Sequence, residues 1–155
     1  MHLERRSLIL IAALGSLVLL AGAFAFQHIG GLAPCRMCIW QRYPHAAALP
    51  IGAFALIVSG IILPLLGALA ALATGAIGVF HTGVERNWWE GPQTCSSARP
   101  EGLTPEELLD HILNAPLVRC DEVSWQMLGL SMASWNSLAS FGLALIWLLA
   151  VRRSA

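Results

Sequence analysis

Three long stretches of the chain carry no charged residue, and they set the predicted architecture. They cover residues 7–35, 43–84 and 123–151. A helix that crosses the hydrocarbon core of a bilayer, which is about 30 Å thick, needs about 20 apolar residues, so each stretch can span a membrane. The pattern therefore predicts an integral membrane protein whose charged residues lie outside the spans.

The middle stretch is too long to be a single span. Its 42 residues would form a helix of about 63 Å, twice the thickness of the hydrocarbon core. The segment must fold back, and Pro64 and Gly67 mark the expected break, because proline lacks a backbone donor and glycine favours turns. We therefore expect an all-α, four-transmembrane-helix bundle. It would form one domain over residues 1–155, with spans at about 7–26, 45–63, 66–84 and 133–151.

Composition and charge support this prediction and orient the bundle. Only 12% of the residues are charged, roughly half the usual share of a soluble protein, and the mean hydropathy is +0.68. Four spans place both termini on one side, and the pairs Arg5-Arg6 and Arg152-Arg153 mark that side as cytoplasmic. Outer loops at about 27–44 and 85–132 would then face the periplasm of a bacterial inner membrane. Against this orientation, five of the nine arginines lie in those outer segments.

An alternative for the N-terminus is a cleavable signal peptide. Arg5-Arg6, the apolar run and the small residues around Phe24 fit that pattern, although the run is long for a signal. Cleavage would leave three spans and the same cysteines outside.

The second outer loop contains its own helix signal. Thr104 offers an N-cap hydroxyl, Pro105 suits the first helical position, and Glu107 completes a capping box. Leucine and isoleucine then recur on one face up to Pro116, which predicts a short amphipathic helix lying on the bilayer. The alternative is a cap over a small loop core. Four tryptophans bracket this loop as expected membrane-interface anchors: Trp88, Trp89, Trp125 and Trp135.

All four cysteines fall in the two outer loops, as Cys35, Cys38, Cys95 and Cys120. In an oxidising compartment an even cysteine count favours disulfides. Two structural disulfides would explain Cys95 and Cys120, but a bond within a C-x-x-C pair closes almost no loop and adds little stability. A zinc or iron–sulfur site needs closely spaced thiolate pairs, and only the first pair has that spacing, so no metal is expected. The cysteines therefore indicate redox chemistry.

A redox pair beside lipid needs an electron acceptor, and the chain has no haem motif or glycine-rich dinucleotide fingerprint. A membrane quinone fits, because it takes the two electrons that disulfide formation releases. Arg42, four residues after Cys38, is the candidate to lower the thiolate pKa and bind a quinone oxygen; alternatively it extends towards lipid headgroups. Pro44 would favour a helix that starts after Cys38, which leaves a shared helix face for Cys38 and Arg42 unsecured.

His81 is the second candidate for the quinone site. It lies in the third predicted span, where ionisable side chains are functional candidates by default. It would bond a quinone carbonyl or relay a proton; the alternative is a histidine satisfied near the interface. His45 and His28 are weaker versions of the same case.

With these residues in place, the chain resembles the DsbB family of bacterial disulfide-bond-forming membrane proteins. The likeness covers four spans and nearly the whole chain, including His81 ahead of Cys95. It is carried by the segment Cys35-Arg36-Met37-Cys38-Ile39-Trp40-Gln41-Arg42, and by Cys120 followed by Leu128-Gly129-Leu130-Ser131-Met132. Pro44 departs from the family pattern and bears on the shape of the quinone pocket.

The resemblance implies a membrane thiol:quinone oxidoreductase that reoxidises a periplasmic DsbA-like, thioredoxin-fold oxidant. That oxidant would attack a Cys95–Cys120 disulfide and form a mixed disulfide at Cys95. Freed Cys120 would then attack a Cys35–Cys38 disulfide at Cys35. Cys38 would pass the electrons to ubiquinone or menaquinone through a charge-transfer adduct steadied by Arg42. The implied partners are the oxidant, the quinone pool and the bilayer, with no nucleic acid.

Two other hypotheses remain at this stage. The chain could be a membrane scaffold or metal-handling protein, including a copper-handling one, whose cysteines are structural. It could also be similar to vitamin K epoxide reductases, which couple a C-x-x-C pair to a quinone in a helical bundle. In those proteins the pair sits at a later span, whereas here it follows the first.

Overall fold

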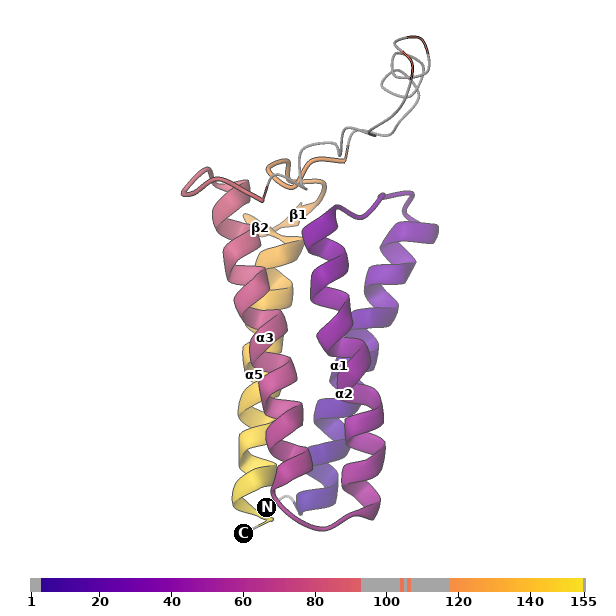
Figure 1. The fold of residues 1–155 in the computed structure, drawn as a ribbon, viewed down its shortest axis with the longest axis vertical. Coiled ribbons are helices and arrows are strands. Elements are labelled where there is room, and N and C mark those ends of the chain that lie inside the picture. Colours follow the sequence, from indigo (N-terminus) through magenta and orange to yellow (C-terminus); the bar gives the residue numbers. More distant parts are fainter. Residues whose placement is uncertain (1–3, 93–103, 105, 107–117, 155) are drawn as a thin grey trace.

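The computed structural model describes residues 4–92, 104, 106 and 118–154. Four long helices lie side by side in a bundle (Figure 1): α1 (Arg5–His28), α2 (Arg36–Ile57), α3 (Ile62–Glu85) and α5 (Met132–Arg152). Helices α2 and α5 each pack against both α1 and α3, which closes the ring of four. Both termini lie at one end of the bundle, and the segments that carry Cys35, Cys38 and Cys120 lie at the other (Figure 1). We call these the terminal end and the cysteine end.

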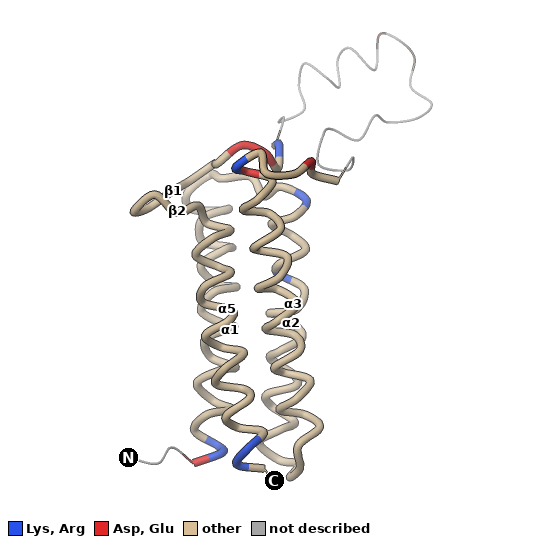
Figure 2. The backbone as a smooth tube through the Cα atoms, turned by 90° about the vertical axis from the view of Figure 1, so that its left-hand side faces the viewer, with Lys and Arg blue, Asp and Glu red and all other residues tan. Residues whose placement is uncertain are grey.

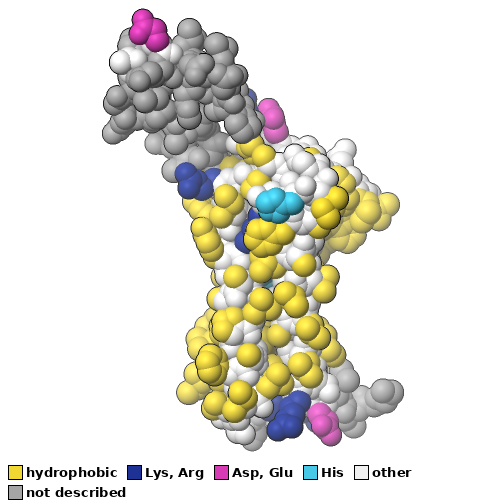
Figure 3. Space-filling model, turned by 90° about the vertical axis from the view of Figure 1, so that its right-hand side faces the viewer, with side chains coloured by type: hydrophobic (Ala, Val, Ile, Leu, Met, Phe, Trp, Pro, Cys, Tyr) yellow, Lys and Arg dark blue, Asp and Glu magenta, His cyan; other side chains and the backbone are white. Residues whose placement is uncertain are grey.

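The bundle has the surface of a membrane protein. Helices α1, α3 and α5 are long and apolar enough to cross a membrane, and α2 is a fourth helix of 22 residues. Charged residues gather at the two ends, with a long uncharged stretch between them (Figure 2). Apolar side chains cover the middle of the face drawn in Figure 3. Large side chains that point outward include Leu14, Val18, Leu138 and Leu145. The chain is therefore an all-α membrane protein, as predicted.

Small residues let the helices approach closely at the terminal end. The core there consists of alanines with Leu8, Ile9, Leu143 and the fully buried Trp147. A Cβ added to Gly67 would lie 2.6 Å from two atoms of the Trp147 ring. Helix association in lipid depends on such close packing, because the lipid is as apolar as the side chains. This glycine is therefore required for contact between α3 and α5.

The predicted break between the second and third spans was wrong, and with it the limits of the second span. The second was expected at 45–63, whereas α2 begins at Arg36 and ends at Ile57, with Pro44 and Pro50 inside it. The chain turns at residues 58–61, where Gly60 has a φ of 127°, a value that favours glycine. Pro64 instead lies in the first turn of α3, where a missing backbone N–H costs no helical hydrogen bond. The proline marked the start of a helix and not the turn.

A short hairpin leads into the last helix. Strands β1 (Gln126–Met127) and β2 (Leu130–Ser131) pair in antiparallel orientation. Leu128 and Gly129, at φ 54° and 77°, form the two-residue turn, as expected of a type I′ hairpin. Ser131 then caps α5, because its hydroxyl accepts a hydrogen bond from the Ser134 backbone N–H. Most of the helix predicted after Thr104 lies outside the described residues.

Candidate functional site

Cys35 and Cys38 lie at the start of α2. Cys35 is the N-cap, and its sulfur accepts a hydrogen bond from the Cys38 backbone N–H at 3.1 Å. Both residues are free thiols, and their sulfurs lie 2.6 Å apart. The hydrogen bond with Cys38, together with burial, raises the pKa of the Cys35 thiol. The proton shared by the pair therefore stays on Cys35, and Cys38 is the sulfur that can act as a thiolate.

Cys38 and Arg42 lie one turn apart on α2, because this helix starts at Arg36 and continues through Pro44. The expectation that Pro44 would leave Cys38 outside the helix was wrong. The cap supplied by Cys35 starts the helix earlier than the proline alone would, so the shared helix face is confirmed.

Cys120 packs against the first cysteine pair. It is 1% exposed and belongs to a buried cluster with Cys35, Met37 and Val84. Cys120 is disulfide-bonded, and its backbone forms a hydrogen bond with His81. Cys95 lies outside the described residues. Three of the four predicted cysteines are thus brought together at one end of the bundle.

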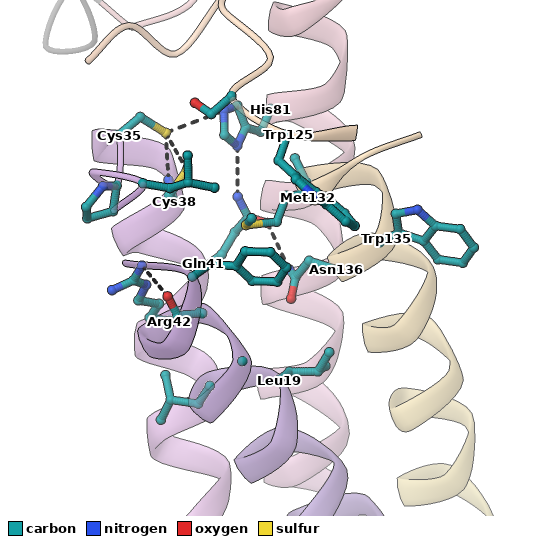
Figure 4. Close-up of a pocket in the computed structure, with 18 of the residues that line it drawn as sticks. Leu19, Cys35, Cys38, Gln41, Arg42, His81, Trp125, Met132, Trp135 and Asn136 are labelled. Atoms are coloured by element: carbon teal, nitrogen blue, oxygen red, sulfur yellow. Dashed lines mark hydrogen bonds between the residues drawn. The ribbon is translucent and has the colours of Figure 1, made fainter. Parts of the chain in front are cut away.

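His81 links this cluster to the interior. Its Nε2 lies 3.5 Å from the Cys35 sulfur, and its Nδ1 lies 3.0 Å from the side-chain nitrogen of Gln41 (Figure 4). Gln41 in turn accepts a hydrogen bond from Asn136 at 2.8 Å. One connected set of side chains from α2, α3 and α5 therefore runs from the thiols into the bundle. Buried polar networks of this kind hold their members in fixed orientations.

Sequence reasoning missed Gln41 and Asn136, although both are polar residues among apolar ones. It also missed Glu85, the last residue of α3. The Glu85 side chain is 6% exposed, with one oxygen 3.9 Å from His81 Nε2. Its other oxygen has no hydrogen-bond partner among the described residues. A search for uncharged polar side chains within the predicted spans would have found Asn136, and Glu85 would follow from its spacing to His81. Gln41 falls in the predicted outer loop 27–44, so that search would have missed it.

Arg42 is held in place by neutral groups. It donates to the Gln27 side chain at 2.5 Å and to the Ala23 backbone oxygen at 3.3 Å. Its guanidinium also lies 4.9 Å from the centre of the Phe24 ring. In the part of the chain that the structure describes, no carboxylate forms an ion pair with Arg42. Its positive charge is therefore available to an anionic group beside Cys38.

A cavity of about 400 Å³ opens beside these residues. Apolar side chains of α1 form one wall, and the polar residues of α2 and α5 form the other (Figure 4). Trp125 and Trp135, predicted only as interface anchors, also line it, whereas Trp88 and Trp89 are exposed at the cysteine end. An apolar cleft with a few convergent polar groups suits a flat, lipophilic ligand with polar edges. The cysteine, polar and charged residues of the helices that line the cavity are Cys35, Cys38, Gln41, Arg42, His45, His81, Glu85 and Asn136.

The same geometry also meets the minimum for a metal site. The Cys35 and Cys38 sulfurs and a ring nitrogen of His81 lie within 4.8 Å of one another. Two cysteines and one histidine are a ligand set that zinc accepts. The metal-handling alternative therefore needs a direct test.

Comparison with known proteins shows the family to which the chain belongs. A family model described as "Disulfide bond formation protein DsbB" matches residues 5–150. The chain belongs to the DsbB family. It is 35% identical over 159 residues to disulfide bond formation protein B of Stutzerimonas stutzeri, covering 92% of each chain. It is 34% identical over 168 residues to the protein of that name from Azoarcus sp., covering 97% of this chain and 95% of the relative. No solved structure matches the chain.

Membership of the DsbB family confirms the predicted resemblance. The protein is a membrane thiol oxidase of disulfide bond formation, and a multi-pass protein of the bacterial inner membrane. The relative from Pasteurella multocida, 33% identical over 148 residues, carries the same name. Within this DsbB-family bundle, the two free thiols line the cavity and the disulfide-bonded Cys120 packs in one buried cluster with Cys35.

Proposed function

We propose that this protein transfers two electrons from a periplasmic DsbA-like dithiol, through two cysteine pairs, to a membrane quinone. The contact between Cys120 and Cys35 carries the proposal. A disulfide-bonded sulfur packs against a free thiol whose partner, Cys38, lines an apolar cavity. Electrons that enter at the loop cysteines can thus reach the cavity by thiol–disulfide exchange alone.

The exchange steps balance in electrons and protons. The partner dithiol reduces the Cys95–Cys120 disulfide and leaves as a disulfide, with Cys95 as the residue that forms the mixed disulfide. The reduced pair then reduces the Cys35–Cys38 disulfide, with Cys120 attacking Cys35. The dithiol at Cys35 and Cys38 finally gives up two electrons and two protons, and its disulfide forms again. Quinone, ubiquinone or menaquinone, takes both electrons and both protons and leaves as quinol.

The side chains around Cys38 have separate roles in this scheme. The raised pKa of Cys35 leaves Cys38 as the thiolate that faces the cavity. Arg42 stabilises negative charge on Cys38 and on the quinone oxygen beside it. His81, fixed by Gln41 and adjacent to Cys35, carries protons between the thiols and the cavity. Burial among apolar side chains keeps these charges from being screened by water.

We further propose that all four helices span the membrane, with both termini in the cytoplasm and both cysteine loops in the periplasm. The arginine pairs at the terminal end support this orientation. Arg5 also donates hydrogen bonds to Ser154 and to the backbone oxygen of Val58, which ties the start of α1 to the ends of α5 and α2. Labelling of cysteines in intact cells with a membrane-impermeant maleimide tests the orientation, and labelling only after lysis would refute it.

Turnover by the purified protein tests the electron path. Detergent-solubilised protein with decylubiquinone should oxidise a reduced DsbA-like partner catalytically, and Cys38→Ser should abolish turnover. Ser16→Ala is the matched control, because Ser16 is buried in α1 and its hydroxyl has no hydrogen-bond partner among the described residues. Unchanged turnover in Cys38→Ser would refute the proposed electron exit.

Two further measurements separate the alternatives. Cys120→Ser should accumulate a mixed disulfide between Cys95 and the partner, which mass spectrometry would identify. A metal-handling protein would instead show no turnover and would release a stoichiometric metal ion when its thiols are alkylated. That release, at Cys35 and Cys38, would replace the proposed function.

A further inference from the structure

His45 is a buried histidine that the proposed electron path does not use. It lies on α2 two turns, about 10 Å, further into the bundle than Cys38. Its side chain lines the cavity and the residue is only 3% exposed. An ionisable side chain at that depth in a membrane is a functional candidate. The hydrogen bonds around His45 indicate its function.

A backbone carbonyl, which can only accept, fixes which atoms of these side chains donate and which accept. The Met37 backbone oxygen can only accept, so the Gln41 side-chain nitrogen must face it, at 3.2 Å. That nitrogen also faces His81 Nδ1 at 3.0 Å, which makes His81 Nδ1 an acceptor. The Gln41 side-chain oxygen is then left to accept from the Asn136 nitrogen at 2.8 Å.

The orientation of the Asn136 amide in turn fixes which nitrogen of His45 carries the hydrogen. The Thr74 hydroxyl donates to the Gln41 backbone oxygen at 2.9 Å, so its oxygen accepts from the Asn136 nitrogen at 3.2 Å. With the Asn136 nitrogen committed twice, its oxygen faces His45 Nε2 at 3.0 Å. His45 Nε2 must therefore carry the hydrogen. Ser140 approaches the same nitrogen at 3.4 Å and leaves the other nitrogen of the ring untouched.

These donor and acceptor assignments leave one ring nitrogen of His45 without a hydrogen-bond partner in the described part of the chain. When Nε2 carries the hydrogen of a neutral imidazole, Nδ1 is an acceptor. His45 Nδ1 is buried and has no hydrogen-bond partner among the described residues. Buried polar atoms are rarely left without a partner, because each one loses the hydrogen bond it would make with water. His45 lines the cavity but Nδ1 itself has almost no accessible surface there, so a hydroxyl donor from a bound molecule would satisfy this atom after a small turn of the ring.

We propose that His45 Nδ1 accepts a hydrogen bond from the inner hydroxyl of bound quinol, so that the cavity holds the reduced form more tightly than the oxidised form. The proposal rests on the proposed function. A quinol has two O–H donors, whereas the quinone has only carbonyl acceptors and offers nothing to a neutral Nδ1. Preference for the reduced form draws two electrons and two protons from the Cys35–Cys38 dithiol towards the ring, and the disulfide forms as the quinone becomes quinol.

Two substitutions at His45 separate its two nitrogens. In His45→Gln the side-chain amide nitrogen takes the place of Nε2 and keeps the bond to Asn136, but the Nδ1 acceptor is lost. In His45→Asn the amide lies one bond nearer the backbone, where its oxygen takes the place of Nδ1, and the bond to Asn136 is lost. Ser137→Ala is the control, because it removes a buried α5 hydroxyl that bonds to the Gly75 backbone and does not line the cavity.

The measurement is the equilibrium Kd for decylubiquinol and for decylubiquinone by calorimetry, after thermal unfolding has shown that each variant folds. In His45→Gln, quinol binding should weaken about tenfold, equivalent to about 30 mV for a two-electron couple, while the Kd for quinone stays within about twofold. His45→Asn and Ser137→Ala should keep the preference. An unchanged preference in His45→Gln, or equal weakening of both forms, would overturn the inference.

Failure of this inference differs from failure of the proposed function. A wild-type protein that binds neither form would overturn both. A wild-type protein that turns over with quinone, and whose preference is the same in His45→Gln, would overturn only the role of His45.

Discussion

Replacing Gln41 with leucine removes the residue that joins three helices at the site. Its side chain bonds to the Met37 backbone, to His81 on α3 and to Asn136 on α5. Leucine fills a similar volume, so the change deletes hydrogen bonds without opening a large cavity. It leaves His81 Nδ1 as a buried acceptor without a donor, whereas Asn136 keeps its bond to Thr74.

The expected loss in the free energy of unfolding follows from the lost bonds to His81 and Asn136. One orphaned buried group costs about 1–3 kcal/mol, whereas single interhelical hydrogen bonds in membranes average only about 0.6 kcal/mol. Because Gln41 is at the centre of the network, we expect a loss of about 1–2 kcal/mol, which for a chain of this size lowers Tm by roughly 2–8 °C. The turnover rate should also fall, and by more than the small loss of stability alone would cause, because His81 loses its fixed orientation.

Thermal unfolding in detergent micelles, with quinone-dependent turnover measured on the same samples, tests this prediction. Gln126→Leu is the control, because Gln126 is exposed in the hairpin. If Gln41→Leu matched the wild type in both Tm and turnover, the network would have no role in holding His81, and the argument for its function would fail.

Three further predictions follow from the geometry. Gly67→Ala should destabilise the fold by about 1–3 kcal/mol by overpacking against Trp147, whereas Gly142→Ala, with nothing near the added Cβ, should stabilise it slightly; chemical denaturation compares the two. Arg42→Gln should raise KM for quinone and lower kcat about tenfold or more, with partial recovery in Arg42→Lys; equal kinetics in all three would reject a role for the charge. Because the pKa of Cys35 is raised, Cys35 stays protonated as pH rises from about 6 to about 9, while the thiolate form of the half-buried Cys38 reacts. Iodoacetamide should therefore modify Cys38 first, and mass spectrometry that found Cys35 modified first at neutral pH would contradict this.

The charge-free stretches predicted the helical membrane fold because the bilayer excludes charge, and that constraint acts residue by residue. The limits of α2 and α3 did not follow from it. They depend on where prolines are tolerated, and Pro44 lies within α2 while Pro64 lies in the first turn of α3. A proline alone does not distinguish a turn from a helix start.

The candidate site was predicted unevenly for a related reason. The Cys35–Cys38 pair and Arg42 are neighbours along one helix, so their spacing was enough to associate them. The contact of Cys120 with Cys35 and the network through Gln41 and Asn136 depend on how helices rotate against each other. That rotation is set by packing of side chains on all four helices, and no single segment encodes it.

The N-cap sulfur of α2 links oxidation state to helix order. Cys35 holds the first turn through its bond from the Cys38 backbone N–H, and it is also the sulfur proposed to exchange with Cys120. Each turnover therefore changes the bonding of the capping sulfur, so the first turn of the helix should be held differently in the oxidised and reduced states. The cavity wall formed by Cys35 and Cys38 would then differ between the two redox states.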